Sequence, residues 1–107
     1  MKRIALLTLV FALSIPSISS GEKSMNDELR YDLAKPLLII KGKNGFLACA
    51  YINPETCNKT GEACAIVSGV SDYDDMKKAK IVAVSESAEK LGIKVGDPGQ
   101  KAIEKFK

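Results

Sequence analysis

Two apolar runs joined by an Asn-Gly pair constrain the fold of this chain more than any other feature. Residues 37–40 read LLII, residues 46–52 read FLACAYI, and Asn44-Gly45 lies between them. Asn-Gly between apolar runs predicts a β-hairpin, because both residues accept positive φ. Since both strands are apolar on both faces, we expect a sheet covered on both sides, by helices or by another subunit.

The other segments alternate between strand and helix signals. Residues 29–33 alternate apolar and polar side chains, which predicts a short, half-buried strand limited by Pro36. Residues 63–67 and 81–84 are expected to form two further strands. Four helices are expected, each after a capping residue or motif. The first runs from Asn53-Pro54 to Gly61, the second follows Asp72 over residues 73–79, and the third runs from Ser85 to Leu91 and is closed by Gly92. The fourth follows the capping box Asp97-Pro98-Gly99-Gln100, and its buried face carries Ala102, Ile103 and Phe106.

These signals predict one small α/β domain, of the α+β-like kind, over residues 29–107. It would hold a mixed sheet of about four strands with an N-terminal hairpin and three to four short helices. The alternation of strands and helices in the second half implies right-handed crossovers and a partly parallel sheet. The 107 residues leave room for one domain.

The first 20 residues have the pattern of a signal peptide or hydrophobic leader. Lys2 and Arg3 precede an apolar run over residues 4–15, which Pro16 ends before several small residues. Because spanning a bilayer takes about 20 apolar residues, a cleaved signal is favoured over an uncleaved anchor or a misassigned start codon. Residues 21–28 would form a flexible tether. The protein would then be secreted or periplasmic; the alternatives are cytoplasmic or membrane-anchored, with membrane contact only through the leader.

Charge and composition exclude several classes of function. The net charge is +3, and without Lys2 and Arg3 it falls to +1, which does not favour a nucleic-acid partner. The chain contains no histidine, which excludes Ser-His-Asp and Cys-His catalysis and removes the commonest metal ligand. No cofactor and no metal site are expected.

The three cysteines are candidate sites. The spacing of Cys49, Cys57 and Cys64 matches no zinc motif. Cys49 and Cys64 lie in apolar strands, where cysteine usually acts as a small buried hydrophobic residue. Cys57 lies in an expected helix and is the cysteine expected to be most exposed. The disulfide state stays open: an oxidising compartment would favour one disulfide and one buried thiol, or a bond between chains.

Two polar segments complete the candidates. Asp74 and Asp75, beside Asp72, could bind a cation or act as a general base together with Cys49. The favoured interpretation is that these acids stabilise the first turn of a helix, by about 0.3–1 kcal/mol each. The small residues Ser68, Gly69 and Ser71 are the preferred ligand-binding candidates, because α/β folds place ligands where strands end.

A resemblance to a known family rests on several segments in a characteristic order. They are Pro36-Leu37-Leu38, residues 45–51 (GFLACAY), Gly69-Val70, Asp74-Asp75-Met76 and residues 91–96 (LGIKVG). Over residues 29–106 the chain resembles the YunC-like family, a domain of unknown function (DUF1805). This resemblance implies a small α/β fold and an oligomer assembled through an N-terminal β region, and it implies no known reaction. The chain departs from the family pattern at Ala50, at Lys77, at Asp97-Pro98 and in its leader.

Two functions are therefore considered. The favoured one is a non-catalytic oligomeric or binding module, because the doubly apolar strands carry more apolar surface than a small monomer covers easily. A homo-oligomer is the expected partner. The alternative is a small Cys/Asp-dependent enzyme or thiol redox protein that uses Cys49 or Cys57 with the acids of residues 72–75.

Overall fold

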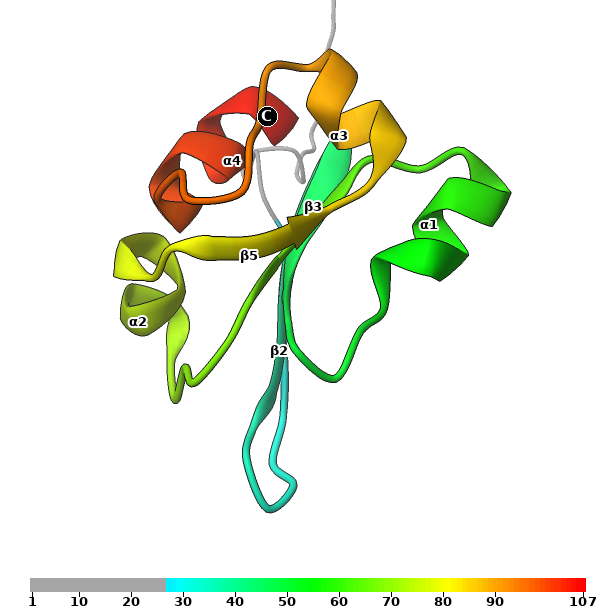
Figure 1. Cartoon of the computed structure of the whole chain (residues 1–107). Helices are drawn as coiled ribbons and strands as arrows, with labels where there is room; N and C mark the ends of the chain where they lie inside the picture. The colour runs from blue at the N-terminus through cyan, green and yellow to red at the C-terminus, as the bar shows by residue number, and fades with distance from the viewer. Residues whose placement is uncertain (1–26) are drawn as a thin grey trace, which may run out of the picture.

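The computed structural model describes residues 27–107, so the predicted leader and residues 21–26 of the predicted tether lie outside it (Figure 1). Five strands and four helices follow in the order β1 (Asp27–Tyr31), β2 (Leu37–Gly42), β3 (Gly45–Cys49), α1 (Pro54–Thr60), β4 (Cys64–Val67), α2 (Tyr73–Lys78), β5 (Ile81–Val84), α3 (Glu86–Lys90) and α4 (Gly99–Phe106). Within this part of the chain, no helix is both long and apolar enough to cross a bilayer.

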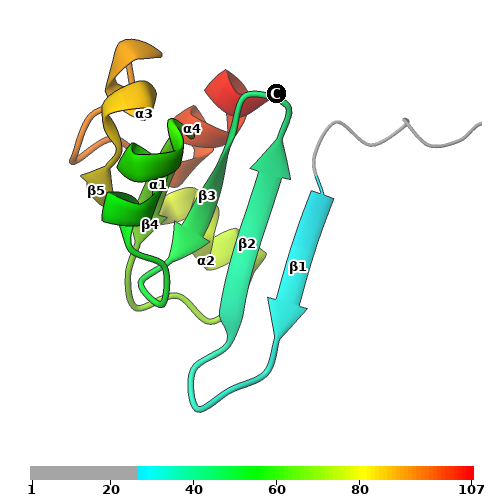
Figure 2. The same ribbon diagram turned by 90° about the vertical axis from the view of Figure 1, so that its right-hand side faces the viewer.

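The strands form one mixed sheet in the order β1-β2-β3-β4-β5 (Figure 2). Only the pair β3 and β4 is parallel, and the other three pairs are antiparallel. The small α+β fold predicted from the sequence is confirmed, with five strands rather than about four. The crossover predicted between the strands over residues 63–67 and 81–84 is wrong, because β4 and β5 are antiparallel. Because α2 packs against α4 and β3, the chain enters β5 near the carboxyl end of β4 and runs back antiparallel.

The hairpin of β2 and β3 forms as predicted, but its turn lies one residue earlier. Gly42 pairs with Gly45, so Lys43 and Asn44 are the two turn residues. Gly45 is the first residue of β3 and has a φ of 153°. A side chain there would overlap the carbonyl oxygen of Ala63 and the ring of Phe106, so the glycine is needed for close packing as well as for its backbone angle.

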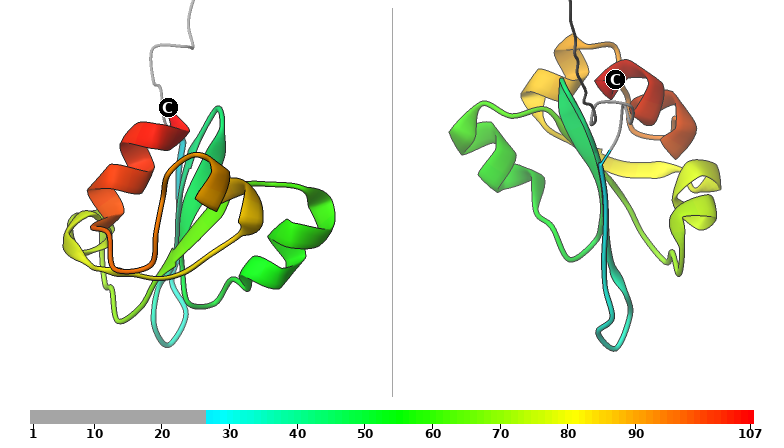
Figure 3. Two further views of the ribbon diagram at one scale, coloured as in Figure 1. Left: turned by 45° about the horizontal axis from the view of Figure 1, so that its top comes forward. Right: turned by 180° about the vertical axis from the view of Figure 1, so that it is seen from behind.

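Helices lie on both sides of the sheet. Figures 1 and 3 show α2 and α4 on one side and α1 on the other. The larger core lies under α2 and α4, and its largest fully buried side chains include Leu38, Leu47, Val67, Met76 and Phe106. All four residues of β4 are buried. The expected double coverage is therefore found at the centre of the sheet.

β1 departs from the prediction of a half-buried strand, because all five of its residues are exposed. It is the outermost strand and its extensive contacts are with β2, while Glu28 and Arg30, on one of its faces, lie near Tyr73 at the start of α2. It also begins at Asp27, so it includes two residues of the predicted tether. The strand predicted over residues 46–52 is shorter than expected and ends at Cys49.

Three of the four predicted helix caps are confirmed. The side chains of Asn53, Asp72 and Ser85 accept hydrogen bonds from the backbone of the first turns of α1, α2 and α3. The capping box predicted for α4 is wrong, since the N-cap is Pro98 and makes no side-chain hydrogen bond. Asp97 instead accepts a hydrogen bond from the backbone N–H of Lys94 at 2.9 Å, which closes the loop before the helix.

Candidate functional site

A pocket of about 330 Å³ lies where three loops meet at one end of the sheet. The loops follow β1, β3 and β4, and the lining residues are Lys35, Pro36, Cys49, Ala50, Tyr51, Ser68, Gly69 and Val70. Its volume is at the lower end of the range of small-molecule sites, which is about 300–1,000 Å³. The lining is largely apolar, with one amino group, two hydroxyls and one thiol.

The position of the pocket follows from the topology. β3 and β4 are adjacent and parallel, so their carboxyl ends lie side by side. The chain leaves β3 for α1 on one side of the sheet and leaves β4 for α2 on the other (Figure 3). Where neighbouring parallel strands continue to opposite faces, their connecting loops diverge and leave a crevice, which is the usual ligand position in open α/β sheets.

The structure brings three of the predicted site residues together. Cys49, at the end of β3, and Ser68 and Gly69, just after β4, all line the pocket. Ser71 does not line it: its N–H donates to the Asp75 carboxylate at 3.0 Å, and its carbonyl accepts from Arg30 at 3.0 Å. These two bonds tie the loop after β4 to α2 and to β1.

The acid cluster lies at the start of α2 and not in the pocket. Asp72 accepts from the backbone N–H of Asp75 at 2.8 Å, and Asp74 lies 4.0 Å from the amino group of Lys77. Neither Asp74 nor Asp75 lines the pocket that contains Cys49. These contacts are those of acids that stabilise a helix start. Within residues 27–107, no group of three or more His, Cys, Asp or Glu residues is placed to hold a metal ion.

Cys49 is the free cysteine of the structure, and it is 4% exposed. Its Sγ accepts a hydrogen bond from the backbone N–H of Leu38 at 3.4 Å. This bond fixes the sulfur against the neighbouring strand β2, while Cys49 as a residue belongs to the lining of the pocket. A small, buried thiol at this position agrees with the expected role of cysteine as a core residue.

Sequence reasoning missed five lining residues: Lys35, Pro36, Ala50, Tyr51 and Val70. The hydroxyl of Tyr51 accepts a hydrogen bond from the backbone N–H of Lys35 at 3.5 Å, across the mouth of the pocket. Lys35 and Pro36 come from the loop before β2, far in sequence from Ser68. The sequence shows that Lys35-Pro36 lies in a loop between two strands. It does not show that this loop lies beside the end of β4, because that depends on the tertiary fold.

Two side chains have shifted pKa values. Burial raises the pKa of Tyr73, and the nearby Glu28 raises it further while Arg30 lowers it. The hydrogen bond from the Lys94 backbone lowers the pKa of Asp97, against a smaller rise from burial, and Lys101 lowers it further. Neither residue lines the pocket, so neither pKa shift belongs to the candidate site. The shift of Tyr73 reflects the closeness of β1 to α2, and the shift of Asp97 reflects the hydrogen bond that holds the loop before α4.

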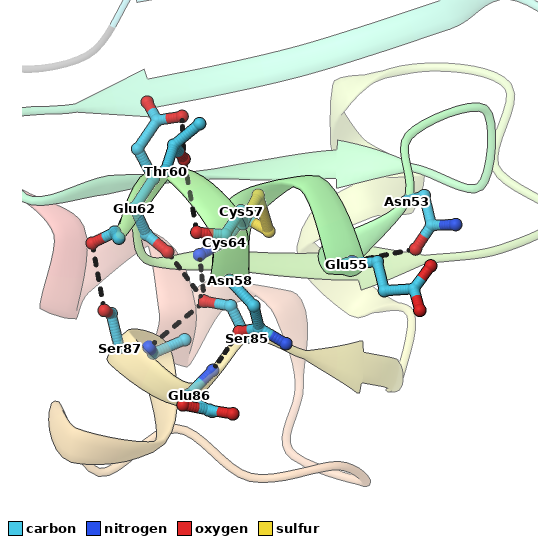
Figure 4. Close-up of a disulfide and its surroundings, with 12 residues drawn as sticks. Asn53, Glu55, Cys57, Asn58, Thr60, Glu62, Cys64, Ser85, Glu86 and Ser87 are labelled. Carbon is cyan, nitrogen blue, oxygen red and sulfur yellow. Dashed lines mark hydrogen bonds between the residues drawn. A yellow bond between two sulfur atoms is a disulfide. The ribbon is translucent and has the colours of Figure 1, made fainter.

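Cys57 and Cys64 form a disulfide that joins α1 to β4 (Figure 4). Cys57 is 2% exposed and Cys64 is fully buried, so the expectation that Cys57 is the most exposed cysteine is wrong. The side chain of Cys57 points from α1 toward the sheet, where bonding to Cys64 removes its thiol. Of the two thiols considered for the enzyme hypothesis, only Cys49 stays free.

Ser85 links the surroundings of the disulfide (Figure 4). Its hydroxyl accepts from the backbone N–H of Cys64 and donates to the carbonyl of Glu62, both at 2.9 Å. Asn58 of α1 also accepts from the N–H of Glu86 at 2.8 Å. Together with the disulfide, these bonds fix α1, β4 and the start of α3 to one another. This cluster is a structural anchor.

Comparison with known families assigns the chain to one of them. The family model described as "Domain of unknown function (DUF1805)" matches residues 48–106. Among proteins of curated function, no sequence matches the chain. The crystal structure of a protein of unknown function, TA1206 from Thermoplasma acidophilum, is similar: it is 36% identical, with a TM-score of 0.71, over 85% of this chain and all of that chain. The chain therefore belongs to the DUF1805 family, as the order of its sequence segments predicts.

Proposed function

We propose that the protein is a non-catalytic module that assembles with copies of itself through β1. The observation that carries this proposal is that all five residues of β1 are exposed, although the strand has large apolar side chains. Leu29 is 50% exposed and Tyr31 is 65% exposed. An outer strand with exposed apolar side chains is open to pairing with another chain unless a partner covers it.

The apolar side chains of β1 continue onto β2. Leu29 lies opposite Ile39, and Tyr31 lies opposite Leu37. Directly opposed residues of an antiparallel pair share a face, so these four side chains form one surface, which we call the β1 face. Ile39 and Leu37 are only partly buried. A contiguous apolar surface of this kind typically marks a protein–protein contact.

The two outer strands of the sheet differ in a way that supports β1 as the contact. β5 has the start of its outer edge covered by the chain itself: the N–H of Ile81 donates to the carbonyl of Asp97 and the N–H of Gly96 donates to the carbonyl of Ile81, both at 2.8 Å. Within the described residues, no segment covers the outer edge of β1 in this way. The family resemblance, which implies assembly through an N-terminal β region, favours the same strand.

We further propose that the protein works in a secreted or periplasmic compartment. The sequence pattern of residues 1–20 supports export. The disulfide between Cys57 and Cys64 supports it independently, because structural disulfides persist mainly in oxidising compartments. The intact mass of the protein isolated from its own host, fraction by fraction, tests this proposal. A cleaved, oxidised chain outside the cytoplasm is expected, and an uncleaved, reduced cytoplasmic chain would contradict it.

Sedimentation velocity tests the assembly. The purified protein is expected to sediment as an oligomer, and the double variant Leu29→Lys/Tyr31→Lys is expected to sediment as a monomer, because two charges would have to be buried in the contact. Val95→Lys is the matched control: Val95 is 61% exposed and lies outside every strand.

The control variant should keep the oligomeric state of the unaltered protein. A monodisperse monomer for the unaltered protein at tens of micromolar would overturn the assembly proposal. An oligomer that the double variant leaves intact would show that another surface makes the contact.

A further inference from the structure

We infer that the pocket at the carboxyl ends of β3 and β4 binds a small organic anion, a monocarboxylate with an apolar body. This goes beyond the proposed assembly, which concerns the β1 face. The pocket is a hollow of about 330 Å³ at the point where two parallel strands continue to opposite faces of the sheet. The inference rests on the shape, the lining and the charge of this hollow.

The lining divides into an apolar part and a polar part. Pro36, Ala50, Val70 and the ring of Tyr51 offer apolar surface for the body of a ligand. Ala50 and Tyr51 are exposed, whereas Val70 is buried, so the apolar surface extends from the rim into the wall. Pockets that are mostly apolar with a few polar groups are typical of small-molecule sites, where the polar groups fix orientation.

The polar groups favour an anion. Lys35 is the one charged residue of the lining, and no residue with a carboxylate side chain lines the pocket. Lys35 takes part in none of the ion pairs found within residues 27–107, whereas Arg30 of β1 is paired with Asp32 at 3.0 Å. The hydroxyls of Ser68 and Tyr51 can both donate to a carboxylate. A cation would meet Lys35 with no compensating negative charge.

The backbone after β4 adds to this polar part. An added Cβ at Gly69 would have no atom of the described chain within 4 Å, so the backbone of this exposed residue is uncovered on that side. Within residues 27–107, no backbone carbonyl accepts a hydrogen bond from the N–H of Gly69 or of Val70. Amide donors without a backbone partner beside a lysine suit a carboxylate better than a neutral ligand.

Titrations followed by NMR of the 15N-labelled protein test the inference. Phenylacetate is the probe, because it combines a carboxylate with an apolar ring. Its binding is expected to be saturable and to shift the amide signals of Ala50, Tyr51, Gly69 and Val70. Acetate, which lacks the apolar body, and 2-phenylethylamine, which replaces the anion with a cation, are expected to cause no saturable shifts at these residues.

Two variants test the assigned groups, and their spectra report directly whether they are folded. Lys35→Met should weaken phenylacetate binding about two- to five-fold, the effect of one exposed charge pair. Ala50→Leu should weaken it more, because the larger side chain occupies the rim of the pocket. Lys90→Met is the matched control, since Lys90 is an exposed lysine of α3 outside the pocket, and it should bind as the unaltered protein does.

Three results would overturn the inference. They are the absence of saturable shifts with phenylacetate, shifts of equal size with 2-phenylethylamine, and shifts confined to the β1 face. The last would indicate unspecific binding of the ring to apolar surface. Repeating the titration on Leu29→Lys/Tyr31→Lys separates the two proposals, because the pocket is expected to bind phenylacetate whether or not the chain assembles.

Discussion

Gly45 is the residue at which the hairpin turn, β3 and the last helix meet. Its φ of 153° favours glycine, and a side chain there would overlap both the carbonyl of Ala63 and the ring of Phe106. The backbone N–H of the neighbouring Asn44 donates to the carbonyl of Phe106 at 2.9 Å. At this position one missing side chain lets α4 lie directly against the hairpin.

Replacing Gly45 by alanine should therefore destabilise the protein more than its backbone angle alone explains. Gly96→Ala is the matched control, because Gly96 has a φ of 95° but no atom within 4 Å of an added Cβ. We expect the control to lower the free energy of unfolding by about 1–2 kcal/mol, and Gly45→Ala to lower it by about 1–3 kcal/mol more. Urea unfolding measures both, and equal losses would contradict the packing argument.

Asp97 predicts a pH dependence of stability. Its pKa is lowered in the folded protein, first by the hydrogen bond from Lys94, so its ionised form is favoured by folding. This stabilisation is fully present above the ordinary pKa of an aspartate, about 3.9, and is lost as the pH falls through the lower folded pKa.

The variant Asp97→Asn isolates this contribution. It should be less stable than the unaltered protein at neutral pH, and the difference should shrink as the pH falls below about 4. Urea unfolding of both proteins between about pH 7 and pH 2 measures it. A difference that stays constant over this range would show that the carboxylate charge of Asp97 does not contribute to stability.

At the scale of elements, the sequence predicted where helices begin, but it did not predict the direction of β5 or the exposure of β1. The caps at Asn53, Asp72 and Ser85 are hydrogen bonds within a few residues, so the sequence contains everything that determines them. The direction of β5 depends instead on where α2 packs. The failed cap at Asp97 has a similar cause, because its carboxylate is taken by the turn at Lys94.

The disulfide is the strongest link between two elements. It closes a short loop, with a sequence separation of 7 between Cys57 and Cys64. A loop of this length should stabilise the protein by about 2–3 kcal/mol through the entropy of the unfolded chain. A reductant should lower the urea midpoint by the corresponding amount, and it should not affect the variant Cys57→Ala/Cys64→Ala.

Mass spectrometry under the same conditions shows whether the bond has been reduced. If the reduced protein unfolds at the same urea concentration as the oxidised protein, the disulfide does not stabilise the link between α1 and β4. Cys49 is buried and unbonded in the folded, oxidised protein.

At the scale of the whole molecule, the sequence predicted the fold class and the end of the sheet where the pocket lies. Ser68 and Gly69 were found because they follow an apolar strand before a helix. Lys35 and Tyr51 were not, because their meeting depends on contacts between distant segments. The exposure of β1 was also missed: alternation of apolar and polar residues shows that one face is apolar, but not whether this chain or another one covers it.

The central claim is that another copy of the chain covers β1. Hydrogen exchange of residues 27–31, measured over a range of protein concentrations, tests it most directly. We expect slow exchange at high concentration that becomes faster on dilution, while β4, fully buried within one chain, exchanges at the same rate throughout. Exchange of β1 that is fast at every concentration would contradict the claim.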